Sequence, residues 1–213
     1  MKLYYGSETL FTEPIFGEGK ITNDYGLGLY MTDSFDLAKL WASKSLNGGY
    51  VLSFDFDLND LNVLNLKDYG EENALKWITI LVNHRFDLNQ KETYQAQIDW
   101  LNKKFRVNLD AVDVIIGYRA DDSYFNYSKS FVANTLSLEI LTEAMRIGKL
   151  GLQYVAISKK AFKRLKFINS VKVEHTDEYS VFQRKALEEY NELKKEDNIN
   201  NTFIRDLMRK YGN

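Results

Sequence analysis

The residue types that most often carry out catalysis or bind metals are rare in this chain. Their rarity excludes several kinds of site. The 213 residues include no cysteine and only two histidines, so thiolate chemistry, disulfides and a metal centre are not expected. The G-x-x-x-x-G-K-[ST] phosphate loop, the H-E-x-x-H zinc helix and the G-x-S-x-G elbow are absent as well.

Short segments beside expected strands carry the candidate site residues. They are Leu3–Ser7, Asp24–Thr32, Asp113–Gly117 with Ala120–Asp122, and Gln153–Ile157. The glycine pairs Gly17-x-Gly19 and Gly26-x-Gly28 lack the third glycine of a dinucleotide fingerprint. The second pair also precedes a strand rather than a helix, so a Rossmann-type site is excluded.

In this order and spacing, these segments resemble the ADP-ribosyltransferase superfamily, in the branch of diphtheria toxin and the poly(ADP-ribose) polymerases. The resemblance covers roughly residues 2–168. It is strongest to a bacterial family of small ADP-ribosyltransferase-like domains that are often encoded beside a small partner protein, as toxins are. It implies NAD as co-substrate, with its nicotinamide in a slot and its glycosidic bond broken through an oxocarbenium-like transition state. The implied activity is mono-ADP-ribosyl transfer to a protein or nucleic acid.

The resemblance also implies a role for each matching residue. Gly6 lies on the first strand, where backbone groups hold the nicotinamide amide and a missing side chain allows close approach. Ser7 bonds the carboxamide or the adjacent ribose, and Tyr30 stacks on the nicotinamide ring. Gly26 and Gly28 let the backbone run close to the ligand. Taken singly, Tyr30 also fits an ordinary core residue of a strand, and the glycine pair fits a bulge or turn.

Two matched positions depart from the pattern of the branch. Tyr5 stands where a histidine usually bonds the adenosine-side ribose, and its hydroxyl can make that bond with a longer reach. Gln153 stands where a glutamate usually bonds the 2′-hydroxyl of the nicotinamide ribose and adds negative charge. Glutamine keeps the hydrogen bond and loses the charge, and losing such a contact costs about 10²–10³ in rate. Either transfer is slow, or Asp121 or Asp122 serves as the acid from a loop after a core strand; otherwise both are solvated loop acids.

These departures leave two further functions open. One is a non-catalytic module that binds NAD or ADP-ribose and acts through contacts with other proteins. The other is an NAD glycohydrolase, which passes the ADP-ribosyl group to water.

Other charged and apolar patterns each have a functional and a structural interpretation. Six basic residues and no acidic one lie between Tyr154 and Val173, and they face either phosphates or solvent. Arg85, near a helix end, could contact a pyrophosphate or merely complement the helix dipole. An apolar stripe in the C-terminal part predicts a helix that packs on the domain or docks a partner such as an antitoxin: Tyr179, Phe182, Ala186, Tyr190 and Leu193.

Hydrophobic periodicity places these residues on strands and helices. Strands are expected at Leu3–Tyr5, Leu29–Thr32, Tyr50–Asp57, Leu61–Leu66, Val112–Gly117 and, as the last one, Leu152–Ile157. A helix with the apolar face Leu37, Leu40 and Trp41 is expected after the N-cap candidates Asp33 and Ser34. Further helices are expected over Glu71–Phe86, Asn89–Phe105, Leu136–Ile147, Lys159–Leu165, the C-terminal stripe and Thr202–Tyr211.

The order of strands and helices predicts an α+β protein. The resemblance implies an ADP-ribosyltransferase-like split β-core over residues 1–173, with two antiparallel sheets, a cleft between them and peripheral helices, and a helical extension is expected over residues 174–213. A hydrophobic content of 45% is ample for a core, and a net charge of −2 argues against a nucleic-acid polyelectrolyte. No stretch approaches the roughly 18 apolar residues of a membrane span, and the first residues read as a strand rather than a signal core. A cytoplasmic location without a membrane partner is expected.

Overall fold

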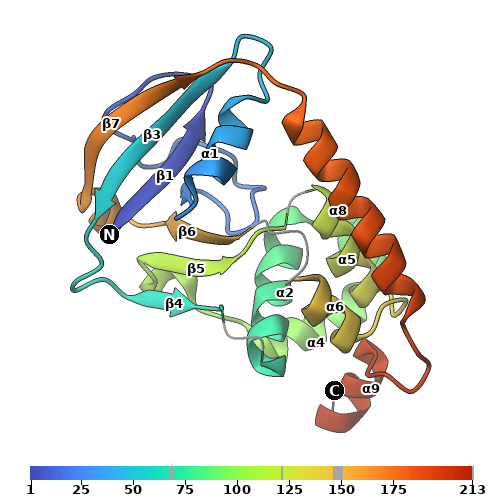
Figure 1. The fold of residues 1–213 in the computed structure, drawn as a ribbon. Coiled ribbons are helices and arrows are strands. Elements are labelled where there is room, and N and C mark those ends of the chain that lie inside the picture. The colour runs from blue at the N-terminus through green and yellow to red at the C-terminus, as the bar shows by residue number, and fades with distance from the viewer. Residues whose placement is uncertain (68–69, 121, 146–150, 213) are drawn as a thin grey trace.

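Two β-sheets packed face to face form the centre of the molecule (Figure 1). The computed structural model describes residues 1–67, 70–120, 122–145 and 151–212. One sheet is antiparallel and follows the order β1 (Lys2–Ser7), β3 (Gly49–Phe56) and β7 (Leu165–Val173). The other follows the order β2 (Leu29–Met31), β6 (Leu152–Ala156), β5 (Val114–Tyr118) and β4 (Val63–Asn65). The predicted α+β class is confirmed.

The expectation that both sheets are antiparallel is wrong for one pair of strands. β4 runs parallel to β5, with Val63 opposite Val114. Parallel neighbours need a crossover connection of about a dozen residues or more, which usually contains a helix. The chain between these strands supplies it, because it forms α2 (Glu71–Arg85), α3 (Leu88–Thr93) and α4 (Gln95–Phe105).

Alternation along the strands explains how the layers stack. On β5, Val114 and Ile116 face the core between the two sheets, whereas Ile115 faces a core shared with the helices. On β3, Val51 turns the opposite way from Leu52 and meets α1 (Phe35–Ala42) on the outer face of the first sheet. The side chains therefore divide into a core between the sheets and one core on each outer face.

Ser34 begins α1 as the sequence predicts, because its side chain accepts a hydrogen bond from the Leu37 N–H. On the other side of the molecule, helices cover the outer face of the second sheet (Figure 1). This helical layer contains α2, α4, α5 (Asp122–Val132), α6 (Leu138–Ala144), α8 (Glu178–Lys195) and α9 (Ile204–Tyr211). No helix in the described ranges is both long and apolar enough to cross a membrane.

Several predicted elements differ from the observed ones. The single helix expected over Asn89–Phe105 is two helices, because α3 ends where Tyr94 leaves helical geometry and α4 begins after it. β7 was not expected, since its exposed and half-buried positions give a weak apolar alternation. α5 was also not expected, and α6 is shorter than the predicted helix, whose last residues lie outside the described ranges.

The C-terminal helices are part of the main core. The α8 residues Tyr179, Ala186, Tyr190 and Leu193 are buried, and the Tyr190 ring lies against the Tyr127 ring of α5, with 3.5 Å between their centroids. α9 buries Ile204 and Leu207, and the indole N–H of Trp100 donates to the Gly212 carbonyl at 3.0 Å. The stripe thus packs on the domain, and its buried members are not open to a docking partner.

This packing predicts a large stability effect from a position close to the C-terminus. Leu207 is fully buried, so Leu207→Ala should lower the free energy of unfolding by about 2–5 kcal/mol through lost burial and a cavity. Ile199, between α8 and α9, is 91% exposed, and Ile199→Ala should change it by less than about 0.5 kcal/mol. Urea unfolding of both variants measures their free energies of unfolding. Equally small losses in the two variants would contradict the inclusion of α9 in the main core.

Candidate functional site

A cavity of about 840 Å³ opens where β1 of the first sheet meets β2 and β6 of the second. Sites for small ligands typically span about 300–1,000 Å³, so this one can hold a nucleotide-sized molecule. Most of the predicted site residues lie together in its wall: Tyr5, Gly6, Ser7, Gly28, Tyr30 and Gln153. Arg85 lines it as well.

The other predicted site residues lie elsewhere. Gly26 is not among the wall residues; it turns the chain with a φ of +77°, and a Cβ there would lie 2.8 Å from the His84 ring. Asp121 lies outside the described residues. Asp122 is the first residue of α5 rather than part of a loop, and its side chain is outside the described part of the chain.

Backbone pairing at β1 directs the peptide groups of Gly6. The N–H and C=O of Tyr4 pair with Thr32, which joins the two sheets, whereas the Met1 carbonyl and the other odd-numbered positions face β3. Successive residues of a strand point their backbone groups to opposite sides. The Gly6 N–H and C=O therefore point away from β3, on the side of the cavity that Gly6 lines.

The absence of a side chain at Gly6 also has a packing cause. A Cβ at this position would meet the backbone of α1 and would lie 2.7 Å from the Trp41 Cβ. Gly28 is similar, because a Cβ there would lie 2.7 Å from the Ala156 carbonyl oxygen of β6. Both glycines therefore let neighbouring elements approach closely beside the cavity that they line.

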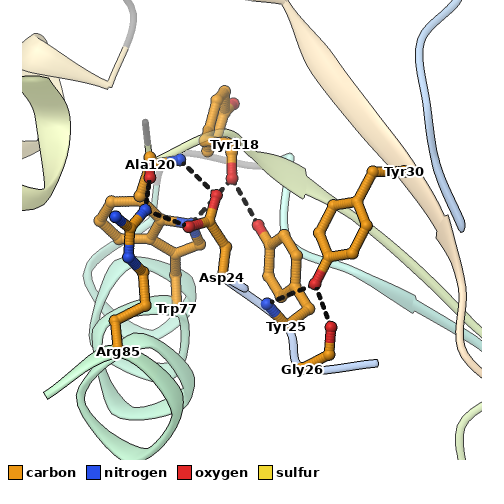
Figure 2. Close-up of polar contacts among 8 residues, drawn as sticks. All are labelled: Asp24, Tyr25, Gly26, Tyr30, Trp77, Arg85, Tyr118 and Ala120. Carbon is orange, nitrogen blue, oxygen red and sulfur yellow. Dashed lines mark hydrogen bonds and ion pairs between the residues drawn. The ribbon is translucent and has the colours of Figure 1, made fainter. Parts of the chain in front are cut away.

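Tyr30 lies on β2 with its hydroxyl fixed by the preceding turn (Figure 2). The hydroxyl donates to the Gly26 carbonyl at 2.6 Å and accepts from the Tyr25 N–H at 3.0 Å. Burial raises the pKa of this phenol above its ordinary value, so it stays protonated. Because the hydroxyl is engaged, Tyr30 offers the cavity its ring and not an acid or base.

A buried ion pair holds the chain segment that leads to Tyr30 (Figure 2). Asp24 is only 6% exposed, and it accepts from the Arg85 guanidinium at 2.7 Å and from the Ala120 N–H at 2.9 Å. Arg85 also donates to the Ala120 carbonyl. Burial raises the pKa of the Asp24 carboxyl, while Arg85 and the Ala120 N–H pull it down. The ion pair therefore ties the loop before β2 to the end of α2 and to Ala120, the second residue after β5.

The neighbouring Tyr25 strengthens this attachment. Its hydroxyl donates to the Tyr118 carbonyl at 2.6 Å, and the same carbonyl accepts from the Trp77 indole N–H at 3.0 Å (Figure 2). Both donors are buried, so each needs such a partner. The segment 24–30 is thus held at both of its ends.

Gln153 lies on β6 opposite Gly117 and is 8% exposed. Its side-chain oxygen Oε1 is buried and has no hydrogen-bond partner among the described residues. Buried polar atoms without a partner are rare, since each carries a desolvation cost. Because Gln153 lines the cavity, an oxygen with unused acceptor capacity belongs to a residue of its wall.

Tyr5 and Ser7 share the other face of β1. The Tyr5 ring packs against Phe11, with 5.7 Å between the centroids, and burial raises the pKa of its phenol. The Ser7 hydroxyl oxygen accepts from the Thr9 N–H at 3.2 Å, a bond that does not use the hydroxyl proton. Both side chains can therefore donate hydrogen bonds to a bound molecule.

One part of the cavity wall, made of aromatic and basic side chains, was not predicted from the sequence. The Arg119 guanidinium carbon lies 3.2 Å from the centroid of the Trp41 ring, and the Tyr179 ring meets Trp41 edge-on at 5.2 Å. Lys44 lies 4.9 Å from the Tyr179 centroid. Trp41 fits the apolar face predicted for its helix, so periodicity assigns it to the core. Tyr179 comes from α8, and only the fold brings it here.

The basic run on α7 (Lys159–Phe162) and β7 is partly neutralised by nearby groups, which favours the structural interpretation. Lys160 lies 3.5 Å from Asp113, and Arg164 lies 3.6 Å from Asp57. Lys172 lies 3.7 Å from Glu174. None of these basic side chains lines the described cavity wall.

The ion pair under the wall should contribute strongly to stability. Asp24→Ala removes the carboxylate that pairs with the mostly buried Arg85 cation and should cost about 3–5 kcal/mol of unfolding free energy. Glu192→Ala, which breaks an exposed pair with Lys195, should cost a small fraction of that. Urea unfolding compares the two, and a loss at Asp24 no larger than the loss at Glu192 would refute the assignment.

The packing cause at Gly6 can be tested in the same way. Gly6→Ala should destabilise by about 1–3 kcal/mol, because its Cβ overlaps α1. At Gly70, which caps α2, a Cβ would meet nothing within 4 Å, so Gly70→Ala should cost about 1 kcal/mol or less. If thermal unfolding shows that Gly6→Ala is as stable as the wild type, then packing against α1 does not require a glycine at this position.

Comparison with known proteins identifies a family. The model of a family described as a protein of unknown function, DUF3990, matches residues 1–167. No curated protein and no solved structure matches the chain. The matched stretch contains every predicted site residue and ends before α8, which supplies Tyr179. The chain, with its cavity between β1, β2 and β6, therefore belongs to the DUF3990 family.

Proposed function

We propose that this protein is an NAD-dependent mono-ADP-ribosyltransferase that binds NAD in the cavity between β1, β2 and β6. The observation that carries the proposal is the buried, unpartnered Oε1 of Gln153 among the described residues, in the same wall as Gly6 and Tyr30. A ribose hydroxyl is a donor that would satisfy this oxygen. The residue resemblance to ADP-ribosyltransferases assigns this hydroxyl to the nicotinamide ribose.

The backbone at Gly6 suits an amide ligand. Its N–H and C=O point toward the same side, so they can bond the C=O and NH₂ of a carboxamide as a pair. Tyr30 and Trp41 line the same cavity, and either ring can bound the nicotinamide. Stacking of a base on an aromatic ring is worth about 1–3 kcal/mol. These groups fix the leaving group and the ribose relative to Gln153.

The wall also offers cations for the two phosphates of NAD. Lys44, Arg85 and Arg119 line the cavity. Arginine binds phosphate through paired N–H groups, whereas lysine acts as a point charge. Arg85 is held by Asp24, so its orientation is fixed before a ligand arrives.

The proposed reaction breaks one bond and forms one. The bond between ribose C1′ and the nicotinamide nitrogen breaks, and its electron pair leaves with neutral nicotinamide. An acceptor nucleophile gives its lone pair to C1′ and releases a proton to solvent. Gln153 Oε1 orients the ribose through its 2′-hydroxyl but brings no charge to the developing cation. Transfer is therefore expected to be slow.

A second candidate is a non-catalytic module that binds NAD or ADP-ribose. It is favoured by the neutral side chain at Gln153 and by the pairing of the buried wall carboxylate, Asp24, with Arg85. The resemblance to toxin families extends the proposal to a bacterial toxin with a neutralising partner. Because the α8 stripe is buried, such a partner would bind another surface.

The test combines NAD binding with product analysis. Calorimetry should detect NAD binding to the wild type, weakened about tenfold by Gln153→Ala and unchanged by Gln95→Ala, which removes an exposed glutamine. Incubation with NAD labelled in its ADP-ribose part and a cell lysate should label protein or nucleic acid. Gln153→Glu should raise the rate by about 10²–10³, because it adds charge at the reacting ribose.

Each other outcome has a distinct meaning. Free ADP-ribose as the sole product identifies a glycohydrolase, with water as acceptor. Binding without turnover in both the wild type and Gln153→Glu identifies the module. Absence of NAD binding and of nicotinamide release would refute the proposed function.

A further inference from the structure

The Trp41 ring in the cavity wall carries a cation on its face. The Arg119 guanidinium carbon lies 3.2 Å from the ring centroid, a stacking distance, whereas Lys44 lies 5.4 Å from it. The Tyr179 ring packs against Trp41 edge-on, which holds the indole in place. Arg119 directly follows β5, so its backbone starts from a rigid strand.

This arrangement conflicts with simple entry of a nicotinamide ring. In NAD the nicotinamide is itself a cation, so it competes with the guanidinium for the ring face and is repelled by its charge. Arg119 must leave the face of Trp41 before that face can accept another planar group. Entry to this position therefore depends on what can attract the guanidinium away.

Phosphate is the group that attracts a guanidinium most effectively. Its oxygens accept two parallel N–H bonds, and a charge-assisted pair of this kind is stronger than a cation–π contact at a partly exposed site. Besides Arg119, the cavity wall holds the cations Lys20, Lys44 and Arg85 and the carboxylates of Glu13, Glu18 and Asp24. Asp24 is already bonded to Arg85 and to the Ala120 N–H, so its carboxylate is engaged, whereas the phosphate of an entering ligand brings oxygens that the Arg119 guanidinium can bond.

We propose that Arg119 is a specificity-determining residue that couples access to the Trp41 face to recognition of a phosphate on the same ligand. The site then selects phosphate-bearing nicotinamide nucleotides over nicotinamide riboside or free nicotinamide. The selection comes from one side chain that blocks the ring position in the free protein and binds the phosphate in the complex. This inference rests on the proposed function, because it takes NAD as the ligand.

Tryptophan fluorescence reports on this position. Trp77 and Trp100 are buried, whereas Trp41 is half-buried and lines the cavity, so a soluble quencher reads mainly Trp41. Inorganic pyrophosphate should increase acrylamide quenching of the wild type, because it draws Arg119 off the indole. The same probe should have no effect on Arg119→Met, which has no guanidinium for pyrophosphate to attract.

Binding of NAD and nicotinamide riboside then measures the selectivity. Arg119→Met should weaken NAD binding at least tenfold and leave riboside binding equal or stronger, so the ratio of the two affinities falls at least tenfold. For Arg119→Lys, the ratio of NAD affinity to riboside affinity should lie between the wild-type value and the Arg119→Met value. The reason is that an ammonium group binds phosphate without the paired N–H geometry of a guanidinium. Arg205→Met, on the exposed side of α9, is the matched control and should keep the wild-type ratio.

The outcomes separate the two proposals. If NAD binds the wild type and Arg119→Met changes both affinities equally or neither, the role of Arg119 is refuted and the NAD site stands. If pyrophosphate leaves wild-type quenching unchanged, the displacement of Arg119 is refuted as well. If no nicotinamide compound binds the wild type or any variant, the proposed function fails and this inference fails with it. Circular dichroism of each variant excludes unfolding as the cause.

Discussion

The site depends on one backbone contact, the pairing of Tyr4 with Thr32 that joins the two sheets. β1 is an edge strand whose odd-numbered residues pair with β3, so its other edge is available at even-numbered residues. At that edge, Tyr4 forms backbone hydrogen bonds with Thr32 of the second sheet. Two residues later, the Gly6 N–H and C=O point to the same side, toward the cavity. A shift of register by one residue would turn these groups into the first sheet and close the site. The same contact thus joins the sheets and fixes the side of β1 from which the Gly6 peptide groups face the cavity.

The loop between β1 and β2 shows how a long irregular segment can form a stable wall. Loops longer than about 12–15 residues are uncommon in compact domains and are often functional. This one, over residues 8–28, is held by the Phe11 ring on Tyr5 and by Asp24 on Arg85. Tyr30 then locks its last turn through Gly26. Since charged, aromatic and backbone contacts hold different parts, the wall keeps its shape without regular secondary structure.

Sequence patterns predict the strongly periodic part of this architecture well. The strands around Tyr30 and Gln153 and the cap at Ser34 follow from local residue types, because burial on one face imposes a period. β7 and the parallel β4–β5 pair do not, since an exposed edge strand shows weak alternation and strand direction depends on distant partners. In the site, the cluster of Tyr5, Gly6 and Ser7 could be placed in advance. Asp24, Trp41 and Arg119 could not, because their roles depend on side chains far away in sequence.

The division of the wall between family and non-family segments bears on function. Gly6, Tyr30 and Gln153 lie within the stretch matched by the family, so the backbone slot and the orphaned acceptor belong to the shared part of the chain. Tyr179 lies outside that stretch, on a helix that is nevertheless built into the core. Its ring meets the Trp41 ring edge-on and lies beside Lys44, so α8 contributes to the part of the cavity wall that these three residues form. A segment beyond the family match therefore completes a cavity wall to which the matched part contributes the strands.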